Sequence, residues 1–282
     1  MAVSGKTATA ESALPAPTGA QTASPESAAQ PAPQRSSAAL DSTAITESTE
    51  VGRQIAAPTA DRPAYVVIYS KGQHDFGGTL ATEKTPAPEI LDQQMDKSLA
   101  QLHYLRADAK HQPAYLIVFA WGCHRALVDA TDDAGFANLL DRAALVGGNA
   151  FASELRTTME QNASVSYATS NGAFGAQLSG MRPVSAAGLF LSISPLERFR
   201  KRDQKTEDLL IQISNDCYYV IISAFDYVSV GKGKSQLLWR TKLTTTSPGT
   251  SLADAIPSLI ASGAGYLGRS MSEAELFSCR SR

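Results

Sequence analysis

The chain has 282 residues, a formal net charge of −2 and a sequence pI of about 6.1. This balance of charge provides no global attraction to nucleic acid or to anionic membranes, so no nucleic-acid partner is expected. No apolar run approaches the roughly 18 residues that a membrane-spanning helix needs. The first residues also lack the apolar stretch of a signal peptide, so an envelope location would require a signal upstream of Met1. Without one, a cytoplasmic location is expected.

Residues 1–62 have the composition of a disordered tail. Seven of the fourteen prolines fall within the first 63 residues, and no Phe, Trp or Tyr precedes Tyr65. A segment rich in Ala, Pro and Ser buries too little apolar surface to offset its conformational entropy. We therefore expect a low-complexity tail over 1–62, either passive or serving as a tether. A single folded domain is expected over 63–268, followed by a flexible tail over 269–282.

The region after residue 63 alternates between strand-like and helical patterns. A β-rich run over 64–70 is followed by an amphipathic helix over 88–105 and by a continuously apolar strand over 114–122. Strand, helix and buried strand in this order predict an α/β or α+β fold. We expect a mixed sheet of about four or more strands packed by amphipathic helices. Further helices are expected over 132–147, 149–162 and 195–214, whereas the pattern over 163–194 leaves the structure open.

The segment Gly231–Ser235, "GKGKS", resembles a phosphate-binding loop. A Walker loop needs four residues between its glycines and a helix after it, and this segment has neither. Strand-like runs lie on both sides, over 218–230 and 236–246. Two β-rich runs joined by a short Gly/Lys segment predict a β-hairpin instead.

A second glycine pattern, G-x-G-x-x-G, is formed by Gly263, Gly265 and Gly268. The dinucleotide fingerprint needs a strand before it and a helix after it. Here the glycines end an amphipathic segment over 251–268, for which Ser251 is the expected N-cap. They therefore indicate a helix terminus, and no cofactor is expected.

The best candidates for chemistry lie at the end of the strand over 114–122. Trp121, Cys123 and His124 occur together in "WGCH", and ligand crevices form at strand ends in open α/β sheets. Cys123 could serve as a thiol nucleophile. However, adjacent residues of a strand point to opposite faces, which would separate Cys123 from His124 as its base.

Asp226 is the fourth candidate residue. It lies within an apolar strand, where a charge is costly unless it is paired. If the turn centres on 231–234, Asp226 comes near Arg240 across the hairpin, so a cross-strand ion pair is expected. The basic stretch over 198–205 is best explained as a solvated helix face, although basic residues near aromatics also occur in nucleic-acid sites.

From residue 88 onward the chain carries "AQLHYLRADAKHQPAYLIVFAWG", "YYVIISAFDY" and "LLWRTKL", followed by the expected closing helix "SLADAIPSLI". This order of features resembles a family of uncharacterised bacterial envelope lipoproteins of unknown function. It implies an α/β sandwich and an envelope association, and it supplies no active-site residues. The lipoprotein signal and lipidated cysteine of that family are missing here, and the segment over 130–215 is long.

Two functions follow from the sequence. The first is a non-enzymatic, envelope-associated domain on a flexible tether that acts through contacts with an unknown protein partner. The alternative is a small-molecule enzyme or binding protein whose site lies at the strand ends near Trp121, Cys123 and Asp226. The first requires an exposed contact surface, and the second requires those three residues to converge on one pocket.

Overall fold

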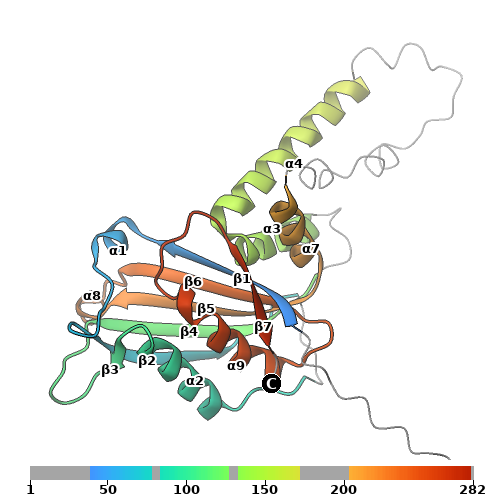
Figure 1. Ribbon diagram of the computed structural model, residues 1–282. Coiled ribbons are helices and arrows are strands. Elements are labelled where there is room, and N and C mark those ends of the chain that lie inside the picture. Colours follow the sequence, from blue (N-terminus) through green and yellow to red (C-terminus); the bar gives the residue numbers. More distant parts are fainter. Residues whose placement is uncertain (1–38, 78–82, 127–132, 172–202, 281–282) are drawn as a thin grey trace, which may run out of the picture. The chain divides into compact units, whose positions relative to one another are not determined.

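The computed structural model describes residues 39–77, 83–126, 133–171 and 203–280 (Figure 1). The predicted tail up to residue 38 lies outside these residues. So do most of the basic stretch over 198–205 and the part of the undetermined segment beyond residue 171.

The described residues contain a mixed sheet of seven strands in the order β3-β2-β4-β5-β6-β1-β7. β2 runs parallel to β3 and to β4, and the other neighbouring pairs are antiparallel. The predicted mixed sheet is therefore confirmed. The strands are β1 (Ala39–Ser48), β2 (Ala64–Gln73), β3 (Tyr104–Arg106), β4 (Tyr115–His124), β5 (Cys217–Asp226), β6 (Leu237–Thr246) and β7 (Glu275–Arg280).

Helices pack on both faces of this sheet (Figure 1). On the first face, α2 (Pro88–Ala100) and α9 (Leu252–Ser262) bury their apolar sides against β4, β5 and β6. On the second face, a separate cluster joins α3 (Asp133–Val146), α4 (Gly148–Asn171) and α7 (Gln204–Ser214) to Ile45 of β1. The short helices α1 (Glu50–Gln54) and α8 (Tyr227–Gly231) lie between strands in the chain.

The predicted hairpin is confirmed, because β5 and β6 pair in antiparallel register from Cys217↔Thr246 onward. The first strand is shorter than the predicted run over 218–230, because residues 227–231 form α8, one turn of helix that ends at Gly231. Gly233 lies in the turn that follows. A strand follows "GKGKS", which is the opposite of what a Walker loop requires.

The predicted helix terminus at the second glycine pattern is also confirmed. Ser251 caps the start of α9 by accepting a hydrogen bond from the amide of Asp254. Gly263 is the C-cap of α9, and a short 3₁₀ turn over Ala264–Tyr266 follows it. The helix therefore precedes the glycines, whereas in a dinucleotide site it would come after them.

Both predicted domain boundaries are wrong. Residues 39–48, placed in the disordered tail, form β1 between β6 and β7. Residues 275–280, placed in the flexible C-terminal tail, form the edge strand β7. β1 was missed because it has few large aliphatic residues. Its buried threonines instead bond across the sheet, Thr46 Oγ1 to Thr241 Oγ1 at 2.7 Å and Thr43 Oγ1 to Thr244 Oγ1.

The position of β1 predicts the effect of truncation. A chain that starts at residue 63 lacks β1, so β6 and β7 lose the strand that joins them. We expect this chain to lose cooperative unfolding in urea, followed by circular dichroism. A chain that starts at residue 37 keeps the whole unit Ser37–Arg282 and serves as the control. Equal unfolding midpoints for the two chains would contradict a structural role for β1.

Candidate functional site

At the end of β4, the candidate residues lie on opposite faces of the sheet, as the alternation of side chains along a strand predicts. Trp121 and Cys123 point into the first-face core beneath α2 and α9. His124 is buried too, but it lies beside Arg142 of α3, on the second face. A thiol and an imidazole on opposite faces of a sheet cannot act as a nucleophile and its base.

The environment of Cys123 also opposes a nucleophilic role. Burial raises the pKa of its thiol to about 11, and the nearby carboxylates of Glu83, Asp216 and Asp75 act in the same direction. Its backbone amide donates a hydrogen bond to Asp75 Oδ1 at 3.0 Å. Because the thiolate is the reactive form, a thiol held protonated in this way is inert. Cys217 and Cys279 are likewise free and buried.

His124 is held in its neutral form. Burial is the main cause that lowers its pKa, and the charge of Arg142 lowers it further. The ring stacks on Phe76 with centroids 5.3 Å apart. Its Nδ1 lies 3.3 Å from the carbonyl oxygen of Arg125, a local contact at the end of the strand. These contacts make His124 part of the packing between β4, α3 and the loop after β2.

Asp226 lies at the opposite end of the sheet. It is the register partner of Tyr115 at the start of β4, whereas Cys123 pairs with Tyr218. Tyr115 and Cys123 are eight positions apart, which corresponds to about 26 Å at the usual rise of a strand. The structure therefore does not bring Trp121, Cys123 and Asp226 into one site.

The predicted ion pair between Asp226 and Arg240 is wrong as well. Asp226 is the N-cap of α8 and accepts a hydrogen bond from the amide of Ser229 at 2.7 Å. Hydrogen bonding from the hydroxyl and then the amide of Ser229 lowers the pKa of Asp226. Arg240 is the register partner of Ser223 and donates from Nε to its hydroxyl at 3.0 Å. Residues of α8 lengthen the connection, so the register of the hairpin differs from the expected one. Arg240 lies opposite Ser223, three positions before Asp226.

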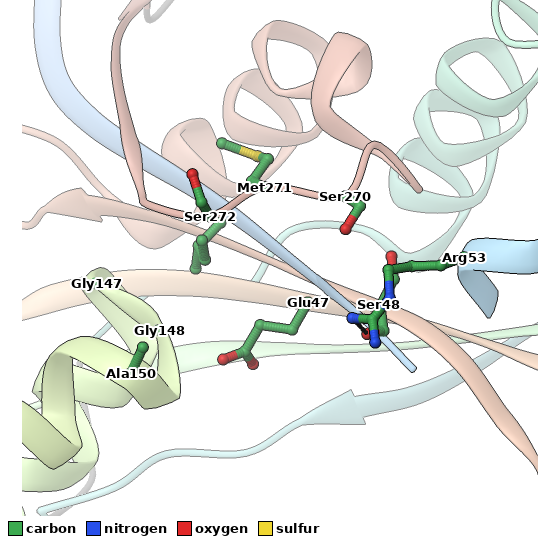
Figure 2. A pocket seen from close by; sticks show the side chains of 10 residues that line it. Glu47, Ser48, Arg53, Gly147, Gly148, Ala150, Ser270, Met271 and Ser272 are labelled. Atoms are coloured by element: carbon green, nitrogen blue, oxygen red, sulfur yellow. Dashed lines mark hydrogen bonds between the residues drawn. The ribbon is translucent and has the colours of Figure 1, made fainter. Parts of the chain in front are cut away.

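A shallow cleft of about 200 Å³ opens where β1, α1 and the start of α4 meet the segment before β7 (Figure 2). Figure 2 shows the Glu47 side chain extending from β1 toward the start of α4. Arg53 lies beside Ser48 and donates a hydrogen bond to its carbonyl oxygen at 3.1 Å. The lining residues are Ile45, Glu47, Ser48, Arg53, Gly147, Gly148, Ala150, Ser270, Met271 and Ser272.

Glu47 in this cleft is already engaged by a buried lysine. Lys242 Nζ lies 2.8 Å from Glu47 Oε2, and its side chain is only 7% exposed. Lys242 also donates to the carbonyl oxygen of Ala144 at 2.8 Å, near the end of α3. Glu47 Oε1 accepts from the amide of Asn149 at 2.7 Å, in the first turn of α4. Each charge thus lies at the helix end whose dipole it complements, and the cleft is primarily structural.

The close turn between α3 and α4 depends on two adjacent glycines. Gly148 has a φ of +88°, which side chains rarely tolerate, and a Cβ there would lie 3.0 Å from Ile45. A Cβ on Gly147 would clash with the ring of Phe151. The turn therefore brings the end of α3 and the start of α4 onto β1 and β6, within reach of Glu47 and Lys242.

The second face also carries apolar side chains that the described helices leave uncovered. Tyr69 is 57% exposed, and Val67 and Leu105 are exposed too. Leu116 and Val118, their neighbours on β4, are half-buried. We call the surface formed by these five residues the open face. Sequence reasoning missed it, although Tyr65, Val67 and Tyr69 recur at the spacing of one strand face.

Neither the models of known protein families nor the curated proteins compared with this chain give a match. Among the described residues, no helix is long and apolar enough to cross a bilayer. Those residues also contain no group of three or more His, Cys, Asp or Glu placed to hold a metal ion. The open face and the cleft are therefore the candidate functional features, and the open face is the one with unsatisfied apolar surface.

The ion pair between Glu47 and Lys242 predicts an asymmetry between its two partners. Glu47→Gln leaves a charged lysine that is nearly inaccessible to water, which should cost about 3 kcal/mol of unfolding free energy. Lys242→Met leaves a carboxylate whose side chain is 28% exposed, so its loss should be smaller. Urea unfolding of both variants measures the difference. A larger loss for Lys242→Met would show that the pair is not governed by desolvation of the lysine.

His124 predicts that the fold is sensitive to mild acid. Its pKa lies below 6.5 in the folded chain and near 6.5 in the unfolded chain. As the pH falls below the pKa of the unfolded chain, His124 binds a proton in the unfolded state but not in the folded state, so the free energy of unfolding falls. This decrease levels off below the pKa of the folded chain, where His124 is protonated in both states. Between neutral and mildly acidic pH, wild type should lose more unfolding free energy than His124→Gln. Equal losses would contradict the lowered pKa.

Proposed function

We propose that this chain is a non-enzymatic, bacterial envelope-associated domain that acts through protein contacts made by its open face. The exposure of Tyr69 beside Val67 and Leu105 is the observation that carries the proposal. Exposed apolar residues gathered on one surface are typical of protein-binding sites, and tyrosine is enriched in them. β3 pairs with β2 only as far as Val66, and the outer edge of β2 beyond it is protected by a bulge after Ser70 and by Lys71. This favours binding to the face of the sheet.

The structural roles of the candidate catalytic residues support a function without catalysis. The Cys123 thiol is buried with a raised pKa, His124 is buried and neutral, and Asp226 caps a helix turn. Each group is committed to packing or to a cap. The envelope association rests on the resemblance of the strand and hairpin segments to envelope lipoproteins and on the Ala/Pro-rich composition of residues 1–38.

Site-specific photo-crosslinking tests the proposal. A photoreactive amino acid at Tyr69 should give discrete protein adducts in the native bacterial host, and these should fractionate with the envelope. The same amino acid at Ile90, which is 53% exposed on α2, is the matched control and should give none. Equal adducts at both positions, or none at Tyr69, would contradict a contact role for the open face. Adducts confined to the cytosol would contradict the envelope association alone.

A further inference from the structure

The open face continues into a cationic border on the same side of the sheet. Cross-strand pairing places Tyr69, Val118, Ser223, Arg240 and Glu47 in one row that crosses β2, β4, β5, β6 and β1. Residues in one such row point to the same face. The row is therefore apolar at β2 and β4 and charged at β6 and β1.

Arg240 carries a charge that the described residues leave without a carboxylate partner. Its Nε donates to Ser223 on β5, which draws the guanidinium over β5 and toward the open face. Glu47, its register partner on β1, is bonded instead to Lys242 and Asn149. Within the described residues Arg53 also binds only a carbonyl oxygen, that of Ser48. This border thus holds the cations Lys242, Arg240 and Arg53 and the carboxylate of Glu47, which pairs with Lys242.

The layered architecture indicates what kind of element would cover the open face. The apolar face of a sheet is normally buried by helices, and α3, α4 and α7 already cover the β1 side of this face. Neighbouring strands lie about 4.8 Å apart, so β2 and β5 are about 10 Å apart across β4. A helix rises about 1.5 Å per residue, so roughly seven residues cover that distance and return to the same helix face.

From this juxtaposition we propose that the open face binds an amphipathic, acidic α-helix of a partner protein. Apolar side chains of the helix pack on Val67, Tyr69 and Val118, and a carboxylate about two turns away pairs with Arg240. This inference rests on the proposed function and specifies the class of protein partner that the open face binds. Charge complementarity selects the acidic partner, because a basic helix would be repelled by Arg240 and Arg53.

Access to the open face is tested first on the isolated full chain. The three native cysteines are buried and free, so a thiol introduced by Tyr69→Cys is the one expected to react with a maleimide under native conditions. Wild type gives the background rate, and Ile90→Cys gives the rate of a thiol at a similarly exposed position on α2. Rapid labelling at Tyr69→Cys is expected. Labelling as slow as that of wild type would overturn the proposal, because the face would already be covered within the chain or by a second copy.

The class of partner is tested by selecting from a display library of helical peptides randomised along one face. The immobilised full chain is the target, and the Val67→Arg variant removes peptides that bind elsewhere. Recovered peptides should combine an apolar stripe with Asp or Glu about two turns away. Arg240→Gln should weaken their binding about tenfold in low salt, and added salt should reduce that difference. Ile90→Arg should leave binding unchanged.

The outcomes separate this inference from the proposed function. Peptides with basic or unbiased charge, or binding unaffected by Arg240→Gln, would overturn the acidic partner while leaving a protein-binding open face. Self-association that Val67→Arg abolishes, or binding to vesicles of anionic phospholipid, would replace the partner helix with a different occupant. Recovery of acidic peptides together with an absence of crosslinks at Tyr69 in the host would support the inference and contradict the proposed function.

Discussion

The insertion of β1 between β6 and β7 is the constraint on which the other features depend. This strand pairs with β6 on one side and with the edge strand β7 on the other. β7 comes from the C-terminal end of the described chain. It also supplies Ile45 to the second core and Glu47 to the buried ion pair. Because hydroxyl groups bond across the sheet at Thr43 and Thr46, β1 stays buried with few large aliphatic side chains.

The ion pair formed on this strand positions the helical layer. Lys242 lies at the end of α3 and Glu47 at the start of α4, so the two charges fix the corner between these helices over β1 and β6. A buried pair of this kind is specific in position even when its net stabilisation is small, because either charge left alone is costly. The described helices of this layer consequently sit toward the β1 side, and the apolar residues of β2 and β4 remain exposed.

This division of the second face is the basis for the functional proposals. The residues with potential for chemistry are separated along the sheet or between its faces, and their hydrogen bonds and burial commit them to structure. Tyr69 and Val67 have no comparable role within the described residues and are exposed on the same face of the sheet as Arg240 of β6. In the same described part of the chain, Arg240 has no carboxylate partner. A binding surface requires both apolar area and a feature that selects the partner, and the row from Tyr69 to Arg240 offers the two together.

The sequence by itself determined the strands β2, β4, β5 and β6, the helices α2 and α9 and the structural nature of both glycine motifs. These depend on local periodicity and on turn and capping residues, which act over a few neighbouring positions. Tertiary structure decided the roles of β1 and β7, since their stability comes from strands distant in the sequence. It also decided the Glu47–Lys242 pair, the register at Arg240 and the exposure of Tyr69. The register between two strands and the burial of a sheet face by helices depend on contacts between distant segments, so they cannot be predicted from a local sequence pattern.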